Sequence, residues 1–186
     1  MTTALKRILV TGGAKRVGKR LVERLSAAGH GVVIHANSNA AEAEQLATKL
    51  RQSNPHTWVL TGDLSNAATA HGLIDQATQL AGAPLSGLIN SASVFDYDQP
   101  AAMDVAMFDK AMAVNLRAPA LLSERFAAQA DPALKLAIVH GAKLGLRSRI
   151  AAGCLVDDSA VNAQAIEATL DATQGFADMP VTRVES

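Results

Sequence analysis

The chain has 186 residues, with 17 lysines and arginines against 17 aspartates and glutamates. This length is typical of a single domain, and the balanced charge excludes a generally basic nucleic-acid-binding protein. Hydrophobic residues make up 49% of the chain and charged residues only 18%, which excludes intrinsic disorder. Because Cys154 is the only cysteine, an intrachain disulfide and a cysteine-based zinc site are excluded as well.

The beginning of the chain does not resemble an export signal. Its apolar run at residues 8–10 is short and stops at glycines, with no small-residue cleavage site after it. No apolar run approaches the roughly 18 residues that a transmembrane helix needs. Together with the free thiol, these features predict a cytoplasmic protein without a membrane partner.

Two patterns alternate along the first 140 residues. Short apolar runs predict buried strands, and longer stretches with apolar residues at i, i+4 and i+8 predict helices. In chain order we expect a strand at 7–11, a helix at 16–28, a strand at 31–35, a helix at 40–52, a strand at 56–61, a helix at 66–80, a strand at 85–90, a helical stretch at 104–130 strained by Pro119, and a strand at 134–140. Such alternation predicts an α/β fold with a Rossmann-like, doubly wound parallel sheet of at least five strands.

The pattern weakens after residue 141. The alanine-rich stretch 151–173 fits a closing helix, whereas residues 164–170 also fit a last strand, and both interpretations stay open. The five histidines show no metal-ligand spacing, so no metal site is expected.

The strongest local signal lies between the first strand and the first helix. It reads Thr11-Gly-Gly-Ala-Lys-Arg-Val-Gly18. A glycine at a strand end permits a tight turn, a glycine entering a helix allows close packing, and the first N–H groups of the helix bind a phosphate. Lys15, Arg16 and Lys19 add positive charge there, so the segment predicts a phosphate site.

Two kinds of phosphate site fit this segment. Residues 13–20 nearly match the P-loop pattern GxxxxGK[ST], but Arg20 has no hydroxyl to coordinate Mg²⁺. The fourth expected strand also ends at Asn90, where a nucleoside triphosphatase would want an aspartate. A P-loop-like nucleotide binder is therefore the less favoured alternative to a dinucleotide site.

The same segment resembles the TGxxxGxG cofactor motif of the short-chain dehydrogenases/reductases. Arg16 stands where most members have the middle glycine, which is similar to the pteridine reductase branch of that family. Further motifs follow in the family's order, so that the resemblance covers residues 5–140. They are Asp63-Leu64, similar to the pair that binds the adenine; Asn90-Ser-Ala-Ser93, similar to NNAS/NNAG; and Asn115, at the position of the family's catalytic asparagine.

The resemblance also implies a cofactor. An acidic residue at the end of the second strand would bind the ribose 2′-OH of NAD, but the segment 35–39 has none. We therefore expect NADP(H), with Asn37 and Ser38 donating to its 2′-phosphate; a simple polar turn is the alternative. The expected cofactor-binding residues are Thr11, Gly12, Lys15, Arg16, Val17, Gly18, Asn37, Ser38, Asp63, Leu64, Asn90 and Ala92. On this basis residues 1–140 form the NADP(H)-binding region, and 141–186 form a shortened C-terminal segment of the same domain.

The resemblance implies a small-molecule substrate that is pterin-like or carries a carbonyl group. Phe95 matches the aromatic residue that, in pteridine reductases, sandwiches the pterin against the nicotinamide. Ser93 and Arg16 match polar residues that touch the pterin and the cofactor phosphates. The alternative for Phe95 is a loop aromatic residue packed on the core.

The chain departs from the family after the fifth expected strand. The family's chemistry needs Tyr-x-x-x-Lys on one helix face, and here the only tyrosine, Tyr97, is followed four residues later by Ala101. The catalytic Ser or Asp expected after that strand is also missing. His140, Lys143 and Asp157 show no spacing that would make them a substitute acid–base set.

The C-terminal part carries a further similarity. Residues 155–164 resemble a late segment of the family, which predicts that the interval with the catalytic helix is absent and that the C-terminal part is incomplete or rearranged. An unrelated closing helix is the alternative. Three functions stay open: an NADPH-dependent reductase, which in this family is a homo-oligomer; an impaired or truncated member that only binds dinucleotide; and a P-loop-like nucleotide binder.

Overall fold

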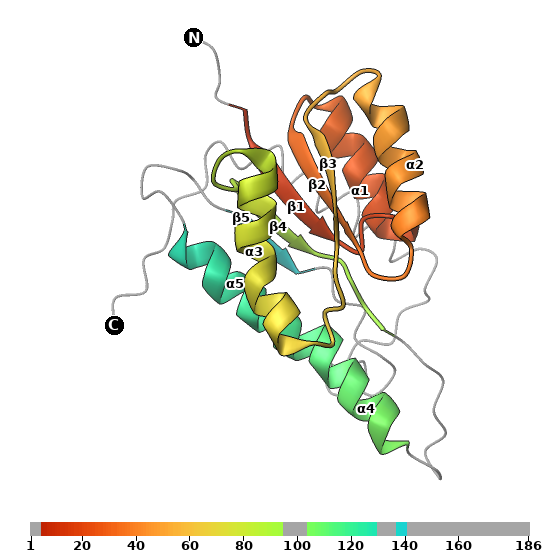
Figure 1. Cartoon of the computed structure of the whole chain (residues 1–186), viewed down its shortest axis with the longest axis vertical. Coiled ribbons are helices and arrows are strands. Elements are labelled where there is room, and N and C mark those ends of the chain that lie inside the picture. Colours follow the sequence, from red (N-terminus) through yellow and green to blue (C-terminus); the bar gives the residue numbers. More distant parts are fainter. Residues whose placement is uncertain (1–4, 95–103, 130–136, 141–186) are drawn as a thin grey trace, which may run out of the picture.

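The computed structural model of the protein describes residues 5–94, 104–129 and 137–140, with five strands in one sheet (Figure 1). The strands are β1 (Arg7–Thr11), β2 (Gly31–Ala36), β3 (Thr57–Thr61), β4 (Gly87–Asn90) and β5 (Ala137–His140). The helices are α1 (Arg16–Ala27), α2 (Ala40–Arg51), α3 (Ala67–Ala81), α4 (Val105–Met112), the π-helical η1 (Ala113–Arg117) and α5 (Ala118–Ala128). The alternating α/β architecture expected from the sequence is confirmed.

The order of the strands shows where a ligand would bind. The order is β3-β2-β1-β4-β5, and every neighbouring pair is parallel. From β1 the chain moves outward through β2 to β3, and after α3 it continues in β4 on the other side of β1. In open α/β sheets, ligands bind outside the carboxyl ends of the strands at such a reversal. The fold therefore directs attention to the segments that follow Thr11 and Asn90.

The sheet has an apolar core on each face because side chains alternate along its strands. Ile8 and Val10 of β1 point into one core with α1 and α2, whereas Leu9 points into the other with α3 and α5. Figure 1 shows these two pairs of helices on opposite faces. All six residues of β2 are buried, which explains why this strand is an almost continuous apolar run in the sequence.

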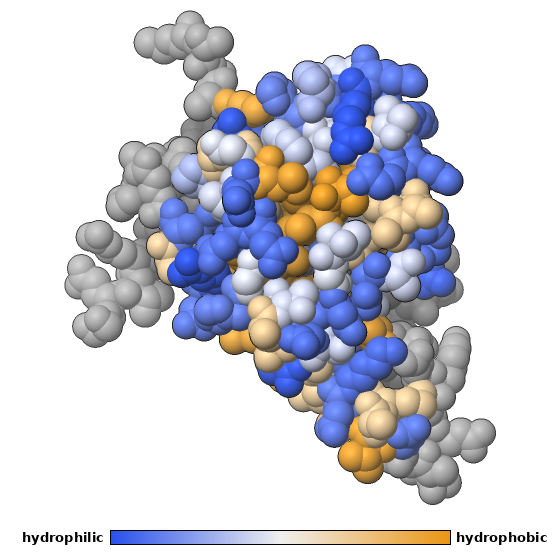
Figure 2. All heavy atoms as spheres, viewed as in Figure 1, coloured by the Kyte–Doolittle hydropathy of each residue, from blue (hydrophilic) through white to orange (hydrophobic). Residues whose placement is uncertain are grey.

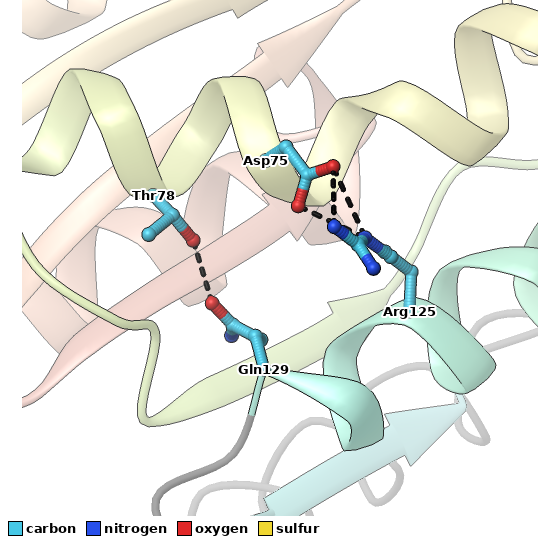
Figure 3. A network of polar contacts seen from close by, with 4 residues as sticks. All are labelled: Asp75, Thr78, Arg125 and Gln129. Carbon is cyan, nitrogen blue, oxygen red and sulfur yellow. Dashed lines mark hydrogen bonds and ion pairs between the residues drawn. The ribbon is translucent and has the colours of Figure 1, made fainter.

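Helices α3 and α5 pack against each other and are joined by polar contacts at their surface (Figure 3). The guanidinium of Arg125 donates to both carboxylate oxygens of Asp75 at 2.9 to 3.0 Å. The Thr78 hydroxyl lies 2.6 Å from Oε1 of Gln129. Because Asp75 and Arg125 are both well exposed, water screens their ion pair, and it orients the helices more than it stabilises them.

The helical stretch expected at 104–130 is present from Val105 to Ala128, but it contains a π-helical turn that the sequence did not predict. It consists of α4, the π-helical turn η1 and α5, without a break in the helical path. Pro119 lies at the start of α5, directly after η1. Proline has no N–H for the helical ladder and its ring crowds the preceding turn, which is where the helix widens to the π form. Asp104 caps α4, because its side chain accepts from the N–H groups of Ala106 and Met107. Asn115 lies within the π-helical turn η1.

Helix α4 has no buried residue and extends beyond the sheet in Figure 1. An exposed apolar stripe runs along α4 and η1, made of Val105, Phe108, Met112 and Leu116. Figure 2 shows apolar residues at this end of the molecule, and a larger apolar area between α3 and α2.

Trp58 and Leu60 of the edge strand β3 are only partly buried against the second core. The expected homo-oligomer stays a prediction.

Several sequence predictions lie outside the described residues. They concern Phe95, Tyr97, Lys143, Asp157 and the whole of 141–186, including its expected helix or strand. Among the residues that the structure describes, no helix combines the length and the apolar character needed to cross a membrane.

The second core offers a direct test of the packing. Phe126 is 0% exposed, and we expect Phe126→Ala to lower the free energy of unfolding by about 3 to 5 kcal/mol because it leaves a cavity. Phe108 is 42% exposed, so Phe108→Ala should change it by less than about 0.5 kcal/mol. Urea unfolding of both variants checks this, and equal losses would contradict the packing of α5 on the sheet.

Candidate functional site

The backbone comes unusually close to itself at the carboxyl end of β1. Gly12 has a φ of +64°, and a Cβ there would lie 2.8 Å from the Cα of Ala92. A Cβ on Gly18 would lie 2.2 Å from the carbonyl oxygen of Gly12. Real Cβ atoms do not approach so closely, so both positions need glycine. The structure thus supplies the tight turn and the close helix packing that the sequence motif predicts.

Arg16 adopts a backbone conformation that normally belongs to glycine. Its φ is +49°, and it has the only positive φ among the described non-glycine residues. Residues other than glycine rarely adopt a positive φ, and where they do, a functional constraint usually accounts for the conformation. The side chain of Arg16 is exposed at the first residue of α1. The conformation agrees with the sequence comparison, in which a glycine of the motif is replaced at this position.

The N-terminus of α1 has the properties of an anion site. Its N-cap residue, Lys15, makes no side-chain hydrogen bond to the first turn, and that turn contains no acidic residue. The exposed side chains of Lys15, Arg16 and Lys19 surround it with positive charge. Uncapped N–H groups, the helix dipole and these cations all favour a bound anion such as a phosphate. Val17 and Gly18 lie in the same turn, and Gly18 is buried.

Lys15 connects this turn to the start of α2. Its Nζ lies 2.6 Å from Oδ1 of Asn39 and 2.8 Å from a carboxylate oxygen of Glu42. The hydrogen bond from Lys15 lowers the pKa of the Glu42 carboxyl. Asn37 and Ser38, just before Asn39, are exposed at the end of β2. The structure therefore brings the expected 2′-phosphate residues and the basic turn to the same edge of the sheet, with the charge of Glu42 already paired.

The Thr11 hydroxyl joins β1 to the segment after β4. It accepts hydrogen bonds from the backbone N–H groups of Ser91 and Ala92, both at 3.0 Å, and donates to the carbonyl of Ile89 at 3.4 Å. Asn90, at the end of β4, is buried beside it. Thr11 thus holds the two sides of the topological reversal together.

Asn115 uses both ends of its side-chain amide on the backbone of Val94. Its Oδ1 accepts from the Val94 N–H at 2.8 Å, and its Nδ2 donates to the Val94 carbonyl at 2.8 Å. These contacts fix the segment after Ala92 and Ser93 to the π-helical turn. In this structure Asn115 therefore orients the loop at the edge of the site, and its expected catalytic role stays a prediction.

Asp63 and Leu64 follow β3 at the same edge. Leu64 is buried, whereas Asp63 is exposed, and its Oδ1 accepts from the Ser65 N–H at 2.9 Å. That hydrogen bond is the main reason why the pKa of Asp63 is lowered, so this carboxylate is charged at neutral pH. Arg117 donates to the carbonyl of Ser65, which links this loop to η1.

His35 is a site residue that the sequence analysis did not select. It lies near the end of β2, only 1% exposed, and its ring touches two of the loops described above. Nδ1 accepts from the Gly12 N–H at 3.4 Å, and Nε2 lies 3.0 Å from the carbonyl oxygen of Gly62. An N–H can only donate and a carbonyl can only accept, so these partners require the neutral ring with its proton on Nε2. A lone histidine in an apolar strand was the signal in the sequence.

Burial lowers the pKa of His35 from 6.5 to about 4, an effect that the hydrogen bond to Gly62 partly opposes. Above pH 6.5 the ring is neutral in both the folded and the unfolded chain. As the pH falls from 6.5, the unfolded chain takes up a proton that the folded chain does not, so the free energy of unfolding decreases until about pH 4.

We expect this difference to reduce the stability by about 3 kcal/mol at most between these two pH values. Urea unfolding from pH 7.5 to 4 measures it, and the profile of His35→Gln should be flatter over that range. The matched control is His71→Gln, since His71 is exposed on α3. Parallel profiles for the wild type and His35→Gln would contradict a buried, neutral His35.

The glycine contacts give a second prediction. Gly18→Ala should lower the free energy of unfolding by about 2 kcal/mol or more, because the new methyl group collides with the Gly12 carbonyl. In Gly72→Ala, on α3, the added Cβ would meet nothing closer than a flexible glutamine side chain at 3.5 Å. That variant should be more stable by about 0.5 to 1 kcal/mol, because alanine favours the helix. Thermal melts compare the two, and a neutral Gly18→Ala would refute the close approach.

Within the described part of the chain, no three histidine, cysteine or carboxylate side chains are grouped so that they could hold a metal ion. The groups gathered at the carboxyl edge are instead backbone N–H groups, basic side chains and hydroxyl or amide groups. This combination suits a phosphorylated organic ligand.

Comparisons with known proteins agree with this geometry. The family model described as short chain dehydrogenase matches residues 6–134, well over half of the chain. NADPH-dependent aldehyde reductase 2 of Arabidopsis thaliana is 28% identical over 121 residues, which cover 59% of this chain and 44% of that protein. Pteridine reductase 1 of Leishmania tarentolae is 44% identical over 63 residues, which cover 33% of this chain and 22% of that protein.

A solved structure is similar over a larger part of the chain. FolM alternative dihydrofolate reductase 1 from Brucella canis, complexed with NADP, is 34% identical with a TM-score of 0.68, and the match covers 73% of this chain and 54% of that one. The chain spans about half the length, or less, of the relatives it matches. The family match, the reversal of the sheet at β1 and the glycine turn together show that this chain belongs to the short-chain dehydrogenase family.

Proposed function

We propose that the carboxyl edge of the sheet binds NADP(H), and that the chain acts as an NADPH-dependent reductase. The observation that carries this proposal is the uncapped, basic N-terminus of α1 beside Gly12 and Gly18. Such a turn at the topological reversal suits the pyrophosphate of a dinucleotide. Residues 1–140 would then be the dinucleotide-binding region of the domain.

The preference for NADP(H) over NAD(H) rests on charge at the end of β2. No acidic residue follows this strand before α2, and the exposed Asn37 and Ser38 stand where a carboxylate would bind the 2′-OH. Glu42, in the first turn of α2, is paired with Lys15, so its charge opposes a 2′-phosphate less than a free carboxylate would. The similar proteins named as NADPH-dependent or complexed with NADP support the same cofactor.

For the substrate, we propose a pterin-like compound. The matched proteins include a pteridine reductase and an alternative dihydrofolate reductase, and Arg16 occupies the motif glycine position in the positive-φ conformation. Ser93 lies in the segment after β4, at the same end of the site. Phe95 lies outside the described residues and stays the aromatic residue that the resemblance implies for the pterin. When bound, NADPH would supply a hydride. The cofactor would be held and oriented by Thr11, Gly12 and the turn of α1. A small carbonyl compound is the alternative, supported by the matched aldehyde reductase.

A second candidate function is dinucleotide binding without turnover. It is favoured by one observation from the sequence, which contains no Tyr-x-x-x-Lys pair to move the proton that a carbonyl reduction needs. NADPH oxidation in the presence of dihydrobiopterin separates the two candidates. Steady oxidation supports the reductase, whereas tight binding of NADPH without oxidation of either a pterin or an aldehyde supports the second candidate.

The cofactor proposal is tested by fluorescence titration with NADPH and NADH. We expect NADPH to bind at least about tenfold more tightly, the loss of one charged hydrogen bond being worth about 1.5 to 3 kcal/mol. Arg16→Ala should remove much of this binding while keeping a Cβ at the positive φ, so that the backbone strain is unchanged. Arg20→Ala is the matched control, because Arg20 is exposed on the same helix and pairs with Glu23.

Equal affinities for the two dinucleotides would overturn the preference for NADP(H). Unchanged NADPH binding by Arg16→Ala would show that the anion site lies elsewhere.

A further inference from the structure

His35 joins two of the loops at the carboxyl edge through three different atoms. Its backbone carbonyl accepts from the Gly13 N–H at 2.9 Å, its Nδ1 accepts from the Gly12 N–H at 3.4 Å, and its Nε2 donates to the Gly62 carbonyl at 3.0 Å. The first two contacts reach the turn after β1, and the third reaches the turn after β3. Since β2 lies between these strands, one residue spans the edge from the glycine turn to the loop that carries Asp63.

These contacts concern the part of the turn that can move least. Gly12 already approaches the backbone of Ala92 so closely that a Cβ on Gly12 would not fit. The Gly12 carbonyl in turn packs against Gly18, where a Cβ would not fit either. A small displacement of Gly12 would therefore carry the start of α1 with it. Ligand sites generally need their groups held to within about 0.5 Å by supporting hydrogen bonds.

The hydrogen-bond partners of the imidazole are backbone groups. A buried polar group needs such partners, because an unpaired one is expensive in an apolar surrounding. The ring is almost fully buried, so it cannot touch a ligand in the open part of the site. Any influence of His35 on a dinucleotide must therefore act through Gly12 and Gly62.

We propose that His35 is a positioning residue, whose Nδ1 holds the Gly12 N–H and thereby sets the affinity of the α1 turn for the dinucleotide. This inference rests on the proposed function, since it names a residue that supports the proposed cofactor site. The contact of Nε2 with Gly62 orients the ring so that Nδ1 faces Gly12.

Two amide substitutions separate the two nitrogens. In His35→Asn, the side-chain oxygen lies close to where Nδ1 was and still accepts from Gly12. In His35→Gln, the amide reaches toward Gly62 and leaves Gly12 without its acceptor. Both variants lose the imidazole, so the general loss of packing is similar in the two, and their difference reports the contact with Gly12.

We expect His35→Gln to weaken NADPH binding about three- to tenfold relative to the wild type, the effect of losing one neutral hydrogen bond. His35→Asn should retain most of the affinity that His35→Gln loses. Titrations are made well below the melting temperatures of all variants. His56→Gln is the control, because His56 is exposed just before β3, at the amino ends of the strands and away from the proposed site. Equal NADPH affinities for the Asn and Gln variants would overturn the proposal.

A measurement on the wild type needs no substitution. In imidazole ¹⁵N NMR spectra we expect His35 to carry its proton on Nε2 at neutral pH, with Nδ1 unprotonated. A proton on Nδ1 would overturn the proposal, because that nitrogen could not then accept from Gly12. The failures are distinguishable: absent NADPH binding by the wild type overturns the proposed function as well, whereas intact wild-type binding with indistinguishable variants overturns only the role of His35.

Discussion

The close approach of three backbone segments at Gly12 is the constraint on which the rest of the site depends. A Cβ on Gly12 would lie 2.8 Å from the backbone after β4, and a Cβ on Gly18 would lie 2.2 Å from the Gly12 carbonyl. These distances bring the end of β1, the start of α1 and the segment after β4 into direct contact. The chain adds strands on one side of β1 and then on the other, so this contact lies at the topological switch point and forms the floor of the site. Thr11 and His35 then hold this floor with side-chain hydrogen bonds from either side.

The positive charge beside the floor of the site comes from a few basic residues in the first turn of α1 and just before it. The turn of α1 presents N–H groups and the cations of Arg16 and Lys19, while Lys15 is paired with Glu42. A basic turn at one position, in a chain whose total charge is balanced, fits recognition of a small anionic ligand better than a polyanion. The positive φ of Arg16 fits this interpretation, because a conformation that strains the backbone is retained where the site needs the side chain.

Much of the fold could be predicted because its strands are buried on both sides of the sheet. The runs at β1 and β2 are apolar almost without interruption, so their bounds lie within one residue of those expected. The π-helical turn was not predicted, since a helical pattern with a proline does not reveal which turn widens. His35 was missed for a related reason: its partners are backbone groups of Gly12 and Gly62, and no sequence pattern marks a backbone group as a partner.

Mapping the backbone amide chemical shifts on adding NADPH would locate a dinucleotide on this sheet. We expect the perturbed amides to cluster at Gly12 to Gly18, at Asn37 and Ser38, and at Asp63, all of which follow the carboxyl ends of β1, β2 and β3. Perturbations concentrated instead at the amino edge, around His30, His56 and Ser86, or no perturbation at all, would contradict a dinucleotide site at the carboxyl edge.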